Sequence, residues 1–160
     1  MIKAAQIWRL PVLAAVIAAA GQSQVEKIAM RTTGISCGIC AGLSEVYFRR
    51  LAGVDQVRIS LKTESIMLTY SPGATFDPKA IRKVLEPLKV GVVQFQIGAR
   101  GQAVENGGKR FLIAGRDKFV LLDAIDSPTV PLGIPVRVEG ILFDRATPKE
   151  LKVLTVKPIH

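Results

Sequence analysis

Strand-like and helix-like hydrophobic periods alternate over residues 24–100, and this alternation restricts the fold more than any other feature of the 160-residue chain. A strand pattern at Ile28 and Met30 leads through a loop at 32–36 into apolar residues at helical spacing. These residues are Ile39, Leu43, Val46, Tyr47 and Leu51, and Gly53 is placed to end the helix.

The pattern then returns to strands. Residues 57–61 and 66–70 alternate in hydrophobicity, which predicts a hairpin that turns at 62–64. Asp77 and Pro78 form a helix start, followed by one apolar stripe, and a last strand covers 93–97. The stripe consists of Ile81, Val84, Leu85 and Leu88. The order βαββαβ predicts a ferredoxin-like domain, with a four-stranded sheet and two helices on one face.

Helical periods disappear after Gly101. Strand patterns occupy 100–105, 109–115, 118–125, 135–144 and 151–157, with glycine- and proline-rich breaks between them. Gly140, inside the fourth run, predicts a bulge or a tight bend. We therefore expect an α+β protein: a ferredoxin-like domain at 24–100, followed by a small OB-like β-barrel domain at 101–160.

The first residues of the chain resemble an export signal. Lys3 and Arg9 precede an apolar stretch at 10–20, and Ala18 to Ala20 satisfy a small-x-small cleavage rule. Eleven helical residues rise only about 16 Å, roughly half the thickness of the hydrocarbon layer. We predict a signal peptide at 1–20, and a mature protein that is exported, periplasmic or extracellular, with no stable membrane anchor after cleavage.

The two cysteines, Cys37 and Cys40, lie between the first strand and the first helix, and His160 is the single histidine. These counts exclude a disulfide framework and a histidine-rich metal site. Two thiols three positions apart at a helix start can converge on one ion, and the helix dipole favours the thiolate. Soft thiolates select Cu(I) first, with Hg(II) and Ag(I) next and Zn(II) as a further candidate. Two ligands leave the ion open to a partner's thiolates.

The segment Gly34-Ile35-Ser36-Cys37-Gly38-Ile39-Cys40 resembles the Gly-Met-Thr-Cys-x-x-Cys loop of heavy-metal-associated domains. This family includes copper chaperones, periplasmic mercury-binding proteins and the amino-terminal modules of metal-pumping ATPases. Residues 53–59 resemble the family's entry to its second strand. Ile35, expected as a buried anchor, and Val92 stand where the family has methionine and tyrosine. The resemblance covers residues 24–100 and implies a metal carrier, chaperone or sensor that uses Cys37 and Cys40.

Other functions fit the same cysteines. They could form the redox pair of an extracytoplasmic thiol-disulfide oxidoreductase, with Cys37 as the attacking thiol, or a local disulfide. So small a disulfide loop gains only about 2 kcal/mol. In a third hypothesis, residues 24–100 form a scaffold that binds no metal, and the barrel is the functional part, an interaction module that docks to a complex of the cell envelope. No enzymatic reaction is predicted, because the sequence offers no acid-base constellation and no nucleophile motif.

Of the formal net charge of +9, most lies in the segment that contains the cysteines: residues 24–100 carry 11 basic and 6 acidic side chains, and 101–160 carry 9 and 7. Without an aromatic cluster, the second segment is a poor nucleic-acid binder, and no nucleic acid is expected as a partner. Lys89, Arg49 and Arg50 are candidates to offset the charge of two thiolates. The partners we expect are a metal-exchanging transporter or cuproprotein and, in a metal-bridged dimer, a second copy.

Overall fold

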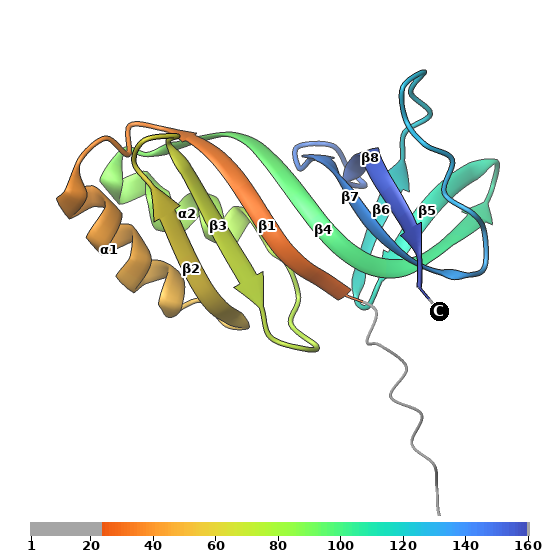
Figure 1. The fold of residues 1–160 in the computed structure, drawn as a ribbon, viewed down its shortest axis with the longest axis horizontal. Coiled ribbons are helices and arrows are strands. Elements are labelled where there is room, and N and C mark those ends of the chain that lie inside the picture. Colours follow the sequence, from red (N-terminus) through yellow and green to blue (C-terminus); the bar gives the residue numbers. More distant parts are fainter. Residues whose placement is uncertain (1–23, 160) are drawn as a thin grey trace, which may run out of the picture.

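The computed structural model describes residues 24–159, so the predicted signal peptide and His160 lie outside it. The elements up to residue 106 follow the predicted βαββαβ order (Figure 1). They are β1 (Gln24–Thr33), α1 (Gly38–Arg49), β2 (Val54–Ser60), β3 (Ser65–Tyr70), α2 (Pro78–Leu85), the 3-10 turn η1 (Glu86–Leu88) and β4 (Gly91–Asn106). The hairpin turn and both helix starts are therefore confirmed.

The first four strands form an antiparallel sheet in the order β2-β3-β1-β4. Helix α1 contacts β2 and α2, and α2 contacts β4, so both helices cover one face of this sheet. Asp77 caps α2 by accepting a hydrogen bond from the Lys79 amide at 2.9 Å, and Pro78 follows at the first helical position. The ferredoxin-like arrangement is thus present in this half of the chain.

Strand β4 runs for 16 residues through the predicted boundary at residue 100. It pairs with β1 over residues 91–100, with β7 (Pro135–Phe143) over 95–102 and with β5 (Lys109–Ala114) over 102–106. We expected two strands with a break near Gly98 and Gly101. These glycines instead permit close approach, because a Cβ at Gly101 would collide with the carbonyl of Ile113.

The remaining strands are β6 (Asp117–Leu121) and β8 (Glu150–Pro158). The pairings return to their start in the order β4-β5-β6-β8-β7-β4, and β6 with β8 is the parallel pair. The predicted strand at 118–125 ends at Leu121. The predicted irregularity at Gly140 is confirmed by a register shift between Glu139 and Gly140. The predicted α+β class is also confirmed.

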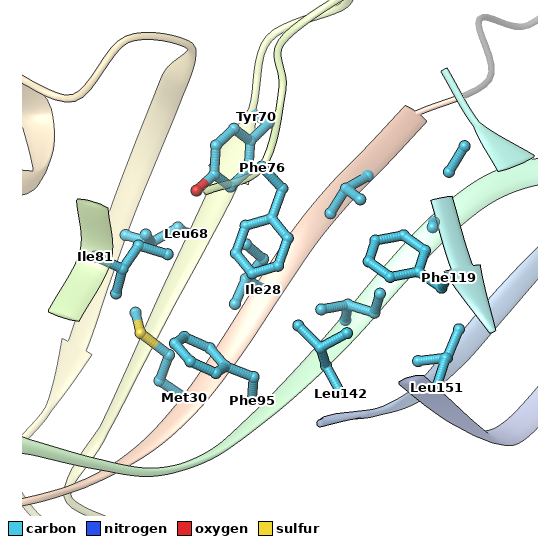
Figure 2. Close-up of a cluster of buried hydrophobic side chains, with 14 of the residues drawn as sticks. Ile28, Met30, Leu68, Tyr70, Phe76, Ile81, Phe95, Phe119, Leu142 and Leu151 are labelled. Atoms are coloured by element: carbon cyan, nitrogen blue, oxygen red, sulfur yellow. The ribbon is translucent and has the colours of Figure 1, made fainter. Parts of the chain in front are cut away.

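One hydrophobic core extends through both halves of the chain (Figure 2). The Phe76 ring meets the Phe95 ring edge-on, with centroids 6.0 Å apart, and Phe119, Leu142 and Leu151 continue the buried cluster. The two predicted domains therefore have one continuous core and share the strand β4. The division at residue 100 stays a prediction. None of the helices in residues 24–159 is long and apolar enough to cross a membrane.

Helix α1 buries a different face from the one that its apolar residues mark. Ile39, Leu43 and Val46 are 79%, 42% and 46% exposed, whereas Phe48 and Ser44 are buried. The Ser44 hydroxyl donates a hydrogen bond to the Cys40 carbonyl at 2.8 Å, which satisfies this polar group inside the protein. The helical period was predicted correctly, but three residues of the apolar stripe point away from the core.

Candidate metal centre

Two residues of the loop between β1 and α1, Gly34 and Ile35, restrict its conformation. Gly34 has φ +87°, a conformation that favours glycine, and a Cβ there would lie 2.9 Å from the Lys89 carbonyl oxygen. Ile35 is fully buried, which confirms its role as an anchor. Gly34 thus lies close to the backbone of the η1–β4 turn, and Ser36 and Cys37, which follow the buried Ile35, are exposed to solvent.

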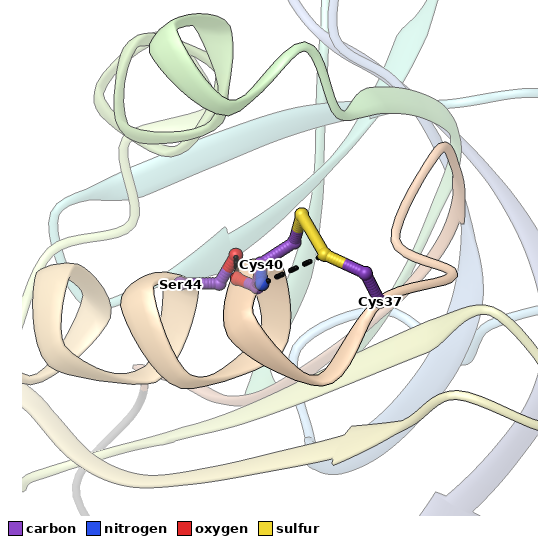
Figure 3. The surroundings of a disulfide bond; sticks show 3 residues. All are labelled: Cys37, Cys40 and Ser44. Atoms are coloured by element: carbon purple, nitrogen blue, oxygen red, sulfur yellow. Dashed lines mark hydrogen bonds between the residues drawn. A yellow bond between two sulfur atoms is a disulfide. The ribbon is translucent and has the colours of Figure 1, made fainter.

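Cys37 is the N-cap residue of α1, and its Sγ accepts a hydrogen bond from the Cys40 amide at 3.1 Å (Figure 3). Cys37 is exposed and Cys40 is half-buried. The hydrogen bond and the positive end of the helix dipole both favour negative charge on the Cys37 sulfur when the residue is reduced. The structure therefore places both predicted ligands at the expected helix start.

The two cysteines form a disulfide bond, with their Cα atoms 5.3 Å apart. In this state neither sulfur is a thiolate, which is the form that binds metal ions. Addition of two electrons and two protons gives two thiols on one turn of α1. The arrangement can then chelate a soft ion, or it can exchange disulfides with another protein.

Of the three cations predicted to offset the charge of the thiolates, Lys89 adjoins the loop. Its backbone has φ +55° at the end of η1, and its carbonyl faces Gly34. Arg49 is paired with Glu45 at 2.8 Å, and the Arg50 guanidinium lies 5.9 Å from the centroid of the Tyr47 ring. Both arginines lie at or just beyond the carboxyl end of α1, about 16 Å along the helix from the cysteines.

Several features of this region were not predicted from the sequence. The Ser44–Cys40 hydrogen bond joins residues four positions apart, and this spacing was the only signal for it. Lys79 and Lys83 also lie four apart on α2 and received no predicted role. Among residues 24–159, no group of three or more His, Cys, Asp or Glu side chains is placed to hold a metal ion.

No family model matches the chain. Among curated proteins, it is 34% identical to a copper-exporting P-type ATPase of Bacillus subtilis over 71 residues, which are 44% of this chain and 9% of that protein. It is 35% identical to a copper-exporting P-type ATPase of Staphylococcus saprophyticus over 51 residues, which are 32% and 6% of the two chains. The chain thus spans less than a tenth of the length of these two relatives.

Among solved structures, a CopZ metallochaperone is 19% identical, with a TM-score of 0.39, over 42% of this chain and 98% of that one. The resemblance to heavy-metal-associated domains rests on the loop sequence, the observed βαββαβ order and the copper-exporting relatives. The family includes modules of metal-pumping ATPases, and these two relatives are copper-exporting ATPases, so the predicted resemblance is confirmed.

Proposed function

We propose that this protein binds a soft metal ion, Cu(I) before Ag(I), Hg(II) or Zn(II), through the thiolates of Cys37 and Cys40. The observation that carries the proposal is the meeting of both sulfurs at the exposed start of α1, where the Cys40 amide donates to Cys37 Sγ. The sequence relatives named as copper exporters support copper as the first candidate. The disulfide must be reduced before the ion can bind.

The proposed role is that of a carrier or sensor that hands its ion to another protein. Two ligands on one exposed helical turn leave coordination positions that a partner's thiolates can occupy. The proposed partner is a transporter or a cuproprotein, and a second copy of the chain would give a metal-bridged dimer. Residues 1–20 are proposed to act as a signal peptide that exports the protein. Mass spectrometry of the exported protein should then find an amino terminus at or near Gly21.

A competition titration of the reduced full chain tests the metal proposal. Cu(I), Ag(I), Hg(II) and Zn(II) compete against a chromophoric chelator, with Cys37→Ala and Cys40→Ala as the variants. Ser36→Ala is the matched control, because Ser36 is an exposed neighbour in the same loop. Each cysteine variant should lose Cu(I) affinity by orders of magnitude, while Ser36→Ala should bind as the wild type does. Unchanged affinity in either cysteine variant would contradict the proposal.

The disulfide itself favours a second candidate, a thiol-disulfide oxidoreductase. In that reaction the Cys37 thiolate attacks a substrate disulfide, one substrate thiol leaves, and Cys40 then displaces the second to form the Cys37–Cys40 disulfide. Equilibration with glutathione measures the reduction potential, and reduction of a disulfide substrate measures turnover. A reduction potential within the range of known thiol-disulfide oxidoreductases, together with turnover that Cys37→Ala abolishes, would favour this function over metal transport.

For residues 101–160 we propose an OB-like β-barrel that serves as an interaction module. The closed ring of strand pairings supports this proposal, and its parallel β6–β8 pair includes a hydrogen bond from the Val120 amide to the Lys149 carbonyl at 2.9 Å. The Leu122 amide donates to the Leu151 carbonyl at 3.0 Å. Hydrogen exchange should find both amides protected. Rapid exchange at both would mean that the ring is open between these strands.

A further inference from the structure

A polar hollow of about 290 Å³ lies on the face of the ferredoxin-like sheet that the two helices leave uncovered. The alternation of β1 places it there, because Met30 is buried in the core and its neighbours Ala29 and Arg31 are on the opposite face. The lining includes Ala29, Arg31, Thr63, Ser65, Gln94 and Gln96. This volume is at the lower end of the range of small-molecule sites, which is about 300–1,000 Å³.

The floor of the hollow is formed by Ala29. In the register of the sheet, Ala29 is opposite Met67 of β3 on one side and Gln96 of β4 on the other. Side chains of residues that are opposite each other in neighbouring strands stand on the same face of the sheet. The single methyl group of Ala29 is shorter than both of these neighbours, so it leaves a depression between them.

The polar wall of the hollow is centred on Arg31. Arg31 is opposite Ser65 of β3 and Gln94 of β4, so its guanidinium has a hydroxyl on one side and a carboxamide on the other. The hydroxyls of Thr63 and Ser65 are hydrogen-bonded to each other at 2.8 Å. Side chains from β1, β4 and the β2–β3 hairpin therefore supply N–H and O–H donors around one hollow.

The charge of Arg31 is not compensated. Arg31 is exposed and forms no ion pair with any described residue between 24 and 159. Within that part of the chain, no acidic residue lines the hollow. Lys27, on the same face, is neutralised by an ion pair with Glu139. A free guanidinium among neutral donors favours an anion, and its planar geometry matches two oxygens of a phosphate or a carboxylate.

We propose that the hollow binds the oxyanion group, a phosphate or a carboxylate, of a small polar molecule. The Arg31 guanidinium holds two oxygens of this group, and the hydroxyl and carboxamide groups of the lining donate to the other polar atoms of the ligand. The hollow and the cysteines are separate sites, so the proposal does not rest on the metal function.

An NMR titration of the ¹⁵N-labelled full chain, with its disulfide intact, tests the proposal. Sodium phosphate and sodium glucuronate are the two probes, and sodium chloride keeps the ionic strength constant, because salt screens exposed charges. The backbone amides of Arg31, Ser65 and Gln94 should shift and reach saturation. The site is open to solvent, so we expect a Kd of about 1–10 mM.

Two variants test the charge and the shape of the hollow separately. Arg31→Gln should bind the anion at least about tenfold more weakly. Its matched control is Arg58→Gln, because Arg58 is an exposed arginine on the same sheet face, outside the hollow and without an ion pair among residues 24–159. Arg58→Gln should bind as the wild type does. Ala29→Leu fills the floor without changing any charge, and it should also weaken binding.

Equal loss of binding in Arg31→Gln and Arg58→Gln would show that only net charge matters, and would overturn the proposal. Unchanged binding in Ala29→Leu would mean that the anion does not enter the hollow, and would also overturn it. The NMR spectrum of each variant reports whether it is folded. Ala29→Val, a smaller change to a residue that favours strands, replaces Ala29→Leu if that variant fails to fold.

The two probes identify the anionic group, and the cysteine variants separate this site from the metal function. Saturable binding of phosphate alone, or of glucuronate alone, supports the proposal and names the oxyanion. Cys37→Ala and Cys40→Ala leave the hollow intact and should bind the anion as the wild type does. A wild type that binds metal when reduced, but neither phosphate nor glucuronate, would overturn the hollow proposal and leave the metal function standing.

Discussion

The guanidinium of Arg82 on α2 donates two hydrogen bonds to the carboxylate of Asp144, which directly follows β7. Nε lies 2.8 Å from Oδ2, and Nη2 lies 2.9 Å from Oδ1. The same group lies 5.0 Å from the centroid of the Phe95 ring. Arg82, from the ferredoxin-like half, is thus bound by a carboxylate at the end of a strand of the ring. The contact is bidentate, the geometry in which charge-assisted hydrogen bonds are strong.

Replacement of Asp144 by Asn should cost roughly 1–3 kcal/mol at pH 7. Burial alone would raise the pKa of Asp144, but the hydrogen bonds and charge of Arg82 outweigh it and hold the pKa below its usual value. The stabilisation is therefore present above the unfolded pKa of about 3.9, and it is lost as the pH falls through the lower folded pKa. Urea unfolding at pH 7 and near pH 2 measures both effects.

The matched control is Glu45→Gln, which removes the exposed pair with Arg49 and should cost less than about 0.5 kcal/mol. A cost for Asp144→Asn that is equal at both pH values would show that the ion pair does not supply it.

Asp117 should show the opposite dependence on pH. Burial raises the pKa of its carboxyl, although a hydrogen bond from the Phe76 amide at 3.1 Å and the nearby charge of Lys149 act against the rise. A raised folded pKa means that the folded protein favours the protonated form. The free energy of unfolding of the wild type, relative to Asp117→Asn, should therefore fall as the pH rises through the folded pKa.

Asp117→Ala removes the acceptor of the Phe76 amide altogether and should cost about 1–3 kcal/mol. Asp117→Asn keeps an acceptor oxygen and is its control. Thermal unfolding of the three proteins between pH 4 and pH 7 checks both expectations. An alanine variant as stable as the asparagine variant would mean that the hydrogen bond contributes nothing.

The two faces of α1 should respond differently to truncation. Phe48→Ala removes a fully buried ring and should cost about 3–5 kcal/mol. Leu43→Ser changes a residue that is 42% exposed and should cost less than about 1 kcal/mol. Urea unfolding of both variants tests which face of the helix is buried. Similar costs would contradict the structure and restore the apolar stripe as the core face.

Gly140 should not tolerate alanine. A Cβ there would lie 2.5 Å from the Lys152 carbonyl oxygen and 2.8 Å from a methyl carbon of Leu151, so the β7–β8 pair would have to shift. Such crowding costs about 1–3 kcal/mol. Gly42→Ala is the control, because nothing lies within 4 Å of its Cβ position, and helix propensity should stabilise that variant by about 0.5–1 kcal/mol. Calorimetry compares the two, and equal melting temperatures would refute the close approach.

Local patterns predicted the elements well, because each depends on residues close in sequence. The hairpin turn at 62–64 and the start of α2 at Asp77 and Pro78 follow from alternation and capping. The position of the cysteines at the start of α1 was predictable for the same reason. The ligand role of Cys37 and Cys40 stays a prediction.

Other features depend on residues far apart in the sequence. The buried face of α1 is set by Phe48 and a satisfied Ser44, and hydrophobicity alone ranks Leu43 above Ser44 for burial. The Arg82–Asp144 pair joins residues 62 positions apart, and no local pattern indicates it. Gly98 and Gly101 resemble a linker in sequence, but they permit neighbouring chain segments to approach β4.

Strand β4 belongs at once to the sheet beneath the helices and to the ring of strands. A chain cut at residue 100 would end inside this strand, after its pairs with β1 and before its pairs with β5. Neither half would keep all the hydrogen-bond partners that it has in the whole molecule. If one half unfolds, the other half therefore loses hydrogen-bond partners along β4. Heat or urea should then unfold both halves in one cooperative transition.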